Sequence, residues 1–255
     1  MTVAHVPEAA TNQYAPGHRP TISVCMATFN GSRFLARQLD TIVRQLQAGD
    51  ELIISDDGSS DRTLEIIEAY RGPNTRVFFN SFHNAASNFG FAISHVRNPL
   101  VFLSDQDDEW LPEKVNRLCA SLASAELVVS DCEVIDETGR TIHASYFELV
   151  RSGRGLLKNL SRNTYLGCCM AFRAELLRAA LPMPPGVAHD LWLGLVGEAF
   201  GRTCFVPEPM SRFRRHGGST SFAAGVSGRP LREKLSERAR AAVWLASRRL
   251  TRSIK

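Results

Sequence analysis

The sequence lacks several features that would place it in a specialised class of protein. Its formal net charge is only +4 over 255 residues, which gives no signature of nucleic-acid binding. No run reaches the roughly 18 apolar residues that a membrane-spanning helix needs. None of the six cysteines forms a Cys-x-x-Cys pair, so we expect reduced core thiols and neither a disulfide framework nor a zinc site. The composition that remains, 44% hydrophobic and 22% charged, is ordinary for a soluble globular protein, and we expect the protein to reside in the cytoplasm.

Charge and hydrophobicity divide the chain into three parts. Residues 1–20 contain Pro, His and Asn without an apolar core, which predicts a disordered extension and not a signal peptide. Residues 21–221 form the expected main domain. Residues 222–255 are basic, with nine Lys or Arg against two acids from Arg229 onward, and their spacing predicts an amphipathic helix. Two interpretations stay open for it: packing on the protein, or lying on the anionic inner face of the cell membrane.

The main domain begins with a regular alternation of strands and helices. Short apolar, β-branched runs alternate with segments whose apolar residues recur at helical spacing. We expect strands at 21–28, 51–55, 76–79, 100–103 and 127–130, and helices at 33–46, 61–70, 85–95 and 112–121. This rhythm predicts an α/β fold with a mostly parallel sheet and helices on both faces.

The alternation breaks after Asp131. Residues 134–142 resemble a hairpin, and the Gly- and Arg-rich segment Ser145–Asn163 is expected to be an irregular, mobile loop. Further on, the pattern predicts strands at 165–172 and 203–206 and helices at 175–180 and 189–200.

Polar clusters follow three of the predicted strands: Thr28-Phe29-Asn30, Asp56-Asp57 and Asp105-Gln106-Asp107-Asp108. In a parallel sheet, ligands bind beyond the carboxyl ends of the strands, so the three clusters predict one assembled site. Crowded carboxylates are costly unless a cation lies among them, and Mg²⁺ or Mn²⁺ with phosphate oxygens would fit. The alternative is a solvated acidic turn that caps the next helix.

Other polar residues also carry two interpretations. Asp57 could accept the N3–H of uracil or thymine, or could simply favour a helix N-terminus. Asp190 could be a general base or a helix cap. The stretch Arg214–Ser219 could bind a diphosphate leaving group or be an exposed loop.

In their order along the chain, these motifs resemble the inverting family 2 glycosyltransferases with the GT-A fold. The resemblance rests on Ser23–Gly31, Asp56–Asp61 and Leu103–Trp110, and it extends over residues 21–221. The motif Ser-Asp-Gln-Asp-Asp-Glu-Trp is similar to that of a rhamnosyltransferase-like branch of this family. The same holds for the motifs His189-Asp190-Leu191-Trp192 and Arg215–Ser219.

The resemblance implies transfer of a sugar, with rhamnose favoured, from a dTDP- or UDP-sugar to a glycan or lipid-linked acceptor in cell-surface polysaccharide synthesis, such as that of O-antigen. A divalent metal, Mg²⁺ or Mn²⁺, is implied as cofactor. Before the aspartate that corresponds to Asp190, the family more often has a glutamate, whereas this chain has His189. The implied roles are nucleotide-sugar contacts for Thr28, Asn30, Asp57, Asp105 and Arg215, metal ligands for Asp107 and His216, the catalytic base for Asp190, and an acceptor pocket for Gly167, Cys168, His189 and Trp192.

Two other functions remain open at this stage. One is a catalytically silent, membrane-peripheral protein that binds nucleotide sugars. The other is a metal-dependent phosphotransferase, although a phosphatase usually carries its Asp-x-Asp after the first strand, where this chain has Thr28-Phe29-Asn30.

Overall fold

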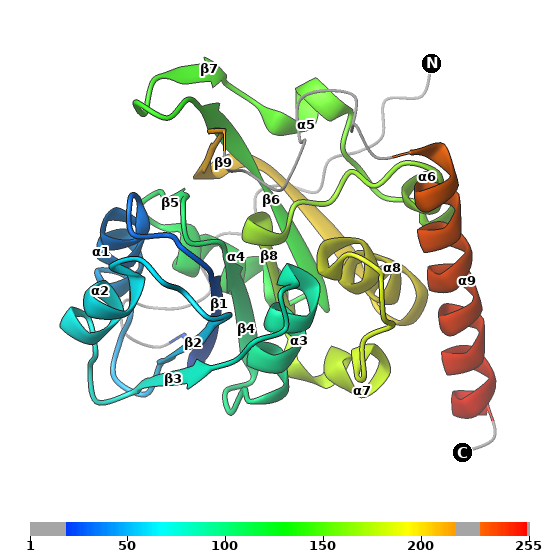
Figure 1. Ribbon diagram of the computed structural model, residues 1–255. Coiled ribbons are helices and arrows are strands. Elements are labelled where there is room, and N and C mark those ends of the chain that lie inside the picture. Colours follow the sequence, from blue (N-terminus) through cyan, green and yellow to red (C-terminus); the bar gives the residue numbers. More distant parts are fainter. Residues whose placement is uncertain (1–18, 218–229, 254–255) are drawn as a thin grey trace.

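The computed structural model describes residues 19–217 and 230–253, and it shows a twisted sheet with helices on both faces (Figure 1). In these residues nine strands join in the order β3-β2-β1-β4-β8-β6-β9-β5, with β7 paired to β6. The strands are β1 (Ile22–Thr28), β2 (Glu51–Asp56), β3 (Thr75–Phe79), β4 (Leu100–Ser104), β5 (Glu109–Trp110), β6 (Leu127–Ile135), β7 (Thr141–His143), β8 (Met170–Arg173) and β9 (Thr203–Arg214).

The sheet is parallel in its first half and mixed in its second. Strands β3, β2, β1 and β4 are all parallel neighbours. Strand β8 runs antiparallel to both β4 and β6, while β9 is parallel to β6 and antiparallel to β5. This arrangement confirms the predicted α/β fold of the GT-A type and adds the antiparallel strands that the sequence rhythm did not show.

The helices and the two 3₁₀ turns connect these strands. They are α1 (Leu35–Val43), α2 (Thr63–Ala69), α3 (Ala85–Ser94), α4 (Lys114–Leu122), α5 (Tyr146–Val150), α6 (Leu156–Ser161), η1 (Gly167–Cys169), η2 (Ala174–Leu176), α7 (Leu177–Ala180), α8 (His189–Phe200) and α9 (Leu231–Ser253).

Two apolar cores lie on opposite faces of the sheet because successive side chains of a strand point to opposite faces. On β1, Val24 and Met26 join the core beneath α1, α2 and α4, while Cys25 joins the core beneath α3 and α8. The central strands β1, β2 and β4 are therefore buried on both sides, as their continuous apolar runs predicted.

Three expected segments were wrong in detail. The segment Ser145–Asn163 is not an irregular loop, because it contains α5 and α6. Ser145 caps α5 by accepting the Glu148 N–H at 3.0 Å, a local signal that the Gly- and Arg-rich composition hid. The strand expected at 165–172 begins only at Met170, after the turn η1. The last strand, β9, continues past the expected residue 206 to Arg214.

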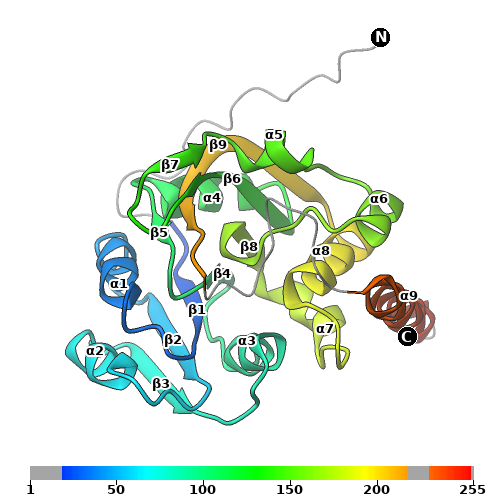
Figure 2. The same ribbon diagram turned by 45° about the horizontal axis from the view of Figure 1, so that its top comes forward.

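The predicted C-terminal helix is confirmed as α9, which lies along one side of the domain (Figure 2). It packs through Glu237, Ala241 and Leu245, and the Glu237 carboxylate accepts the Ala188 N–H at 2.9 Å. The apolar side chains of the opposite face stay 60–71% exposed: Leu231, Leu235, Val243 and Leu250. In the described parts of the chain, no helix is long and apolar enough to cross a membrane. The expected extension at 1–20 lies almost entirely outside the described residues.

Candidate active site

The three predicted polar clusters meet at one edge of the sheet. Parallel register sets Thr28 beside Asp56 and Met26 beside Ser104, so β1, β2 and β4 end together. The Gln106 side chain then bridges to Phe29, accepting its N–H at 2.9 Å and donating to its carbonyl at 3.0 Å. These hydrogen bonds join the acidic cluster to the end of the first strand.

Thr28 and Asn30 hold the loops after β1 and β2 together at this edge. The Thr28 hydroxyl donates to Asp56 at 2.8 Å, and the residue is only 1% exposed. Asn30 adopts a positive φ of 47°, which asparagine tolerates better than most residues, and its Oδ1 accepts the Ser60 N–H at 2.8 Å. Both residues thus stabilise the walls of the edge, and their nucleotide contacts stay a prediction.

The Asp57 carboxylate is buried and bound to backbone amides. It accepts N–H groups from Phe82, from His83 at 3.0 Å and from Asn84 at 2.9 Å. Asn84 in turn caps α3 by accepting the Ser87 N–H. A carboxylate offers about four acceptor positions, so three amides leave room for one base N–H. Asp57 therefore fixes the loop after β3, and its contact with a base stays a prediction.

Asp107 and His216 form a partly buried oxygen–nitrogen pair. The His216 Nε2 lies 2.8 Å from the Asp107 Oδ2, and the two side chains are 16% and 19% exposed. Asp107 comes from the β4–β5 loop, and His216 lies two residues after the end of β9. A carboxylate with an imidazole, open to the surface on one side, suits Mn²⁺ or Mg²⁺ that completes its coordination with phosphate oxygens.

Arg214 is buried at the end of β9, so the expectation that it belongs to an exposed loop is wrong. Its N–H donates to Asp108 at 2.9 Å, and its guanidinium pairs with Glu109. These contacts hold the strand that delivers His216 against the acidic loop. Arg215 follows with a backbone hydrogen bond to Ile135 and a partly exposed side chain. Residues 218–221 lie outside the described part.

Carboxylates crowd the centre of the site. Burial, together with the nearby Asp107 and Asp190 carboxylates, raises the pKa of Asp105 to about 8. Burial also raises the pKa of Asp108, with Asp107 and Asp105 adding to the effect. Asp190 lies in the first turn of α8, where its carboxylate accepts the Leu191 N–H and, at 3.2 Å, the Asn163 amide. Like charges gathered in this way favour a cation between them.

The residues expected at the acceptor side divide into two groups. The His189 ring stacks on Phe89 at 4.1 Å, and its Nε2 is buried without a hydrogen-bond partner in the described residues. Burial lowers the pKa of His189, so the ring is neutral. A side chain on Gly167 would come within 2.5 Å of that nitrogen, so glycine makes room for the ring. Trp192, by contrast, is fully buried and donates to the Ala180 carbonyl, which places it in the core.

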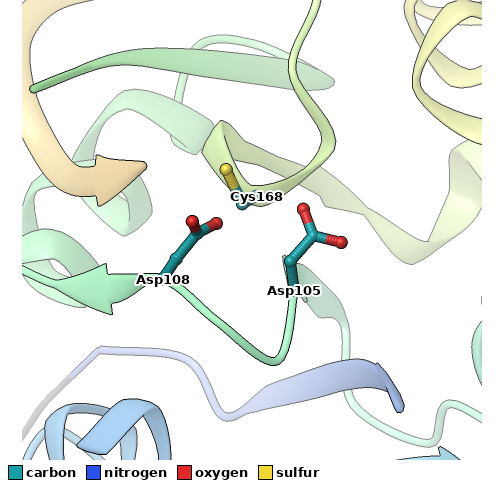
Figure 3. A group of neighbouring side chains, drawn as sticks. All are labelled: Asp105, Asp108 and Cys168. Atoms are coloured by element: carbon teal, nitrogen blue, oxygen red, sulfur yellow. The ribbon is translucent and has the colours of Figure 1, made fainter. Parts of the chain in front are cut away.

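Cys168 approaches the acidic loop from η1. Asp105, Asp108 and Cys168 each offer one ligand atom, and these atoms lie within 4.8 Å of one another (Figure 3). Two carboxylates and a thiol therefore share one space beside the Asp107–His216 pair.

Sequence reasoning missed Lys114, which lies beneath this site. It is fully buried, and its ammonium donates to the Cys168 carbonyl at 2.6 Å and to the Ser211 hydroxyl at 2.5 Å. The ammonium also lies 4.7 Å from the centre of the Trp110 ring. Its spacing of four residues from Leu118 places it on the buried stripe of α4, and this is the signal that could have revealed it.

Comparisons with known proteins agree with this geometry. The family described as Glycosyl transferase family 2 matches residues 23–181. An uncharacterized glycosyltransferase of Nostoc sp. is 25% identical over 80% of this chain, and the chain spans 67% of that protein. The dTDP-rhamnosyl transferase RfbG of Shigella flexneri is 34% identical over 35% of this chain, which spans only about a third of the relative.

Solved structures show the same fold at low identity. S. aureus TarS 1–349 in complex with UDP-GlcNAc has a TM-score of 0.68 at 18% identity, over 89% of this chain and 69% of TarS. The mannosyltransferase of Pyrobaculum calidifontis, solved with GDP-Man and Mn²⁺, has a TM-score of 0.58 at 18% identity, over 84% of this chain and 59% of its own. The family match over most of the α/β domain, together with the GT-A fold, shows that this chain belongs to glycosyl transferase family 2.

Proposed function

We propose that the chain is an inverting glycosyltransferase that moves a sugar, rhamnose in the first instance, from a dTDP- or UDP-sugar to a hydroxyl of a glycan or lipid-linked acceptor in cell-surface polysaccharide synthesis. The observation that carries the proposal is that Asp107 and Asp190 both lie close to Asp105. Asp107, which is paired with His216, suits a diphosphate with its metal, whereas Asp190, from α8, suits a reacting hydroxyl.

The relatives support the donor class. TarS was solved with UDP-GlcNAc and the Pyrobaculum enzyme with GDP-Man, so this fold accommodates nucleotide sugars in both. Rhamnose is favoured by the name of the Shigella relative, which matches over 98 residues. The polysaccharide context is supported by a succinoglycan biosynthesis protein of Rhizobium meliloti, 25% identical over 61% of this chain.

The proposed reaction is a displacement at the anomeric carbon of the donor sugar. The Asp190 carboxylate, oriented by the Asn163 amide, accepts the proton of the acceptor hydroxyl. The hydroxyl oxygen forms a bond to the anomeric carbon from the face opposite the diphosphate. The bond from that carbon to the diphosphate oxygen breaks, and the diphosphate leaves with the electron pair. A single displacement inverts the anomeric configuration.

Asp107 and His216 are the residues that would hold the metal, since their carboxylate and imidazole match the ligands that Mn²⁺ prefers. When bound, Mg²⁺ or Mn²⁺ neutralises negative charge on a diphosphate. Arg214 supports the pair indirectly, because its backbone and guanidinium anchor β9 to the acidic loop. Arg215, next along the chain, would add positive charge near the leaving group.

A donor screen tests this proposal. The chain is incubated with dTDP-rhamnose, UDP-sugars or GDP-mannose, with and without Mn²⁺, and thermal stabilisation and nucleotide release are followed. We expect stabilisation that requires both metal and one nucleotide base, and its loss in Asp107→Ala. Glu65→Ala is the matched control, because that carboxylate is 68% exposed on α2 and pairs only with Arg62 among the contacts of its side chain in the described residues.

The same screen separates the alternatives. Stabilisation by a nucleotide sugar without any turnover, even with a complex glycan acceptor mixture, would favour a silent binding protein. Release of phosphate from simple phosphomonoesters would favour a phosphotransferase. Full turnover by Asp107→Ala would overturn the assignment of the metal ligands.

We further propose that the exposed apolar face of α9 binds an anionic membrane surface. Leu235 and Val243 are 60% and 68% exposed on the side opposite the packed residue Ala241. Exposed arginines border this apolar face, including Arg232 and Arg240, so its charge is complementary to acidic lipid headgroups.

Vesicle binding tests the membrane proposal. We expect the chain to sediment with vesicles that contain phosphatidylglycerol and not with phosphatidylcholine vesicles, and the double variant L235S/V243S to lose binding. Because both side chains point away from the domain, its fold should survive. Equal binding by wild type and variant, or a concentration-dependent dimer that the variant abolishes, would overturn the membrane assignment.

A further inference from the structure

A second group of potential metal ligands lies beside the Asp107–His216 pair. Asp105 and Asp108 come from the loop after β4, and Cys168 comes from η1, far away in the sequence. Their ligand atoms lie within 4.8 Å of one another, and Figure 3 shows both carboxylates and the thiol facing a common space. Neither Asp107 nor His216 belongs to this group.

The hydrogen bonds of Asp108 supply a second observation about this space. The residue is 1% exposed, and its Oδ1 accepts the Arg214 N–H at 2.9 Å. Its Oδ2 is buried and has no hydrogen-bond partner among the described residues. The Cys168 thiol faces it, but a thiol is a weak donor. A buried carboxylate oxygen without a strong partner is costly, and a cation would remove that cost.

The ligand types indicate which cation. Magnesium and manganese prefer oxygen ligands, whereas a thiolate favours softer ions such as Zn²⁺, Co²⁺ or Cd²⁺. Two carboxylates and one thiolate leave a fourth position of a tetrahedral ion for water or a phosphate oxygen. The Asp107–His216 pair has no sulfur and lies nearer the surface. The two sites therefore differ in the ions that they select.

We propose that Asp105, Asp108 and Cys168 bind a thiophilic divalent cation, with Zn²⁺ as the natural candidate. The Cys168 thiol releases its proton to solvent and the thiolate bonds to the ion, so no oxidation or reduction takes place. The Lys114 ammonium, hydrogen-bonded to the Cys168 carbonyl, is a like charge near this group and opposes ion binding, so loss of any one ligand should weaken the affinity.

Occupancy of this site has a consequence that rests on the proposed function. Asp105 is also an expected nucleotide-sugar contact, so an ion that holds its carboxylate competes with the donor. Zinc is then an inhibitor even when Mn²⁺ saturates Asp107 and His216. Donor nucleotide, in turn, displaces the soft ion.

The binding test uses Cd²⁺ or Co²⁺ with the reduced full chain. Sulfur bound to either ion gives a ligand-to-metal charge-transfer absorption band, which reports on the thiolate without any activity assay. We expect one band-forming ion per chain in wild type, loss of the band in Cys168→Ser, and affinity weaker on the order of ten-fold or more in Asp108→Asn. Cys204→Ser is the matched control, because that thiol is partly exposed on β9 and lies outside the group.

Each outcome decides the proposal. Absence of a band in folded wild type, or an unchanged band in Cys168→Ser, overturns it. Retention of the band in Asp107→Ala supports a site separate from the catalytic metal. Loss of the band in Asp107→Ala would assign the sulfur to the Asp107–His216 site and overturn the separate site. Because Asp108→Asn keeps the thiol, it tests the site even if Cys168→Ser fails to fold. Binding without any sugar transfer would contradict only the proposed function.

Discussion

The two halves of the site differ in how their carboxylates are compensated. On the proposed nucleotide side, Asp56 accepts four hydrogen bonds and Asp57 accepts three, all from hydroxyl and amide donors of the fold. On the proposed transfer side, the partly buried Asp105 and the buried Asp108 lie among other carboxylates, and Asp108 keeps one oxygen without a partner in the described residues. The carboxylates of the first half are therefore held by the fold itself, whereas those of the second repel one another, and a cation and a substrate would relieve that repulsion.

The largest expected effect is on the transfer side, from Asp190→Asn. The amide keeps the shape of the side chain but cannot accept the acceptor proton, so we expect transfer to fall by about 10²–10⁴-fold. Donor affinity and thermal stability should change little, because the residue is partly exposed at the start of α8. Measuring kcat with saturating donor and acceptor, beside the stability of the variant, checks this. A loss confined to donor KM would show that Asp190 binds the nucleotide sugar and is not the base.

The next effect comes from Lys114→Met, which tests what holds the second half together. Removing the ammonium leaves the buried Cys168 carbonyl and Ser211 hydroxyl without their donor, and we expect a loss of about 2–3 kcal/mol in the free energy of unfolding. It also removes a positive charge that lowers the pKa of Asp105. Lys158→Met, at an exposed lysine of α6, is the control and should stay within about 0.5 kcal/mol of wild type. Similar denaturation midpoints for the two variants would contradict this role.

Asp57→Ala tests the proposed nucleotide side. Three amides from the loop after β3 lose their acceptor, so we expect a loss of about 1–3 kcal/mol of stability in the absence of any ligand. Asp57→Asn keeps one acceptor oxygen and should fall between wild type and alanine in urea unfolding. A donor KM that rises with unchanged stability would mean that Asp57 serves the base alone.

The nucleotide half was the easier one to predict from sequence. Its strands are local, each followed by a helix, and parallel register sends residues such as Thr28 and Asp56 to one edge. The second half depends on contacts between distant segments: β8 inserts between β4 and β6, and Lys114 meets Ser211 across 97 residues. No local period reports such pairings, so the strand order of that half and the role of Lys114 emerged only from the structure.

The site shows the same limit. Motif order placed Asp107 and His216 together, and the structure brings them to 2.8 Å. Motif order could not show that Trp192 fills the core or that the Asp108 carboxylate is buried, because burial depends on what packs above a residue. The apolar stripe of α9 was visible in the sequence, but its outward direction was not, because a second face of the helix contacts the domain through Ala241.

The smallest expected effect is a gain in stability, opposite in sign to the effect of Asp57→Ala. Asp105→Asn should raise the stability of the metal-free protein, because the charged form of Asp105 is opposed by burial and by Asp107 and Asp190. The fold raises the pKa of this carboxyl from 3.8 to about 8, so its contribution is fully favourable below pH 3.8 and is lost as pH rises through about 8. Asparagine does not titrate, so its advantage should grow over that window and reach about 1–2 kcal/mol above it. Thermal melts with a chelator at acidic and alkaline pH measure this.

Asp136→Asn supplies the control for that comparison. Hydrogen bonds from Thr138 and Arg140 lower the pKa of this exposed carboxyl, so the fold favours its charged form and asparagine should bring no gain at alkaline pH. If Asp105→Asn also brings none, the carboxylates of the transfer side are already compensated inside the protein, and the contrast between the two halves fails. If only Asp105→Asn gains, and Mn²⁺ with donor reverses the order by stabilising wild type more, the repulsion at this edge is what ligand binding relieves.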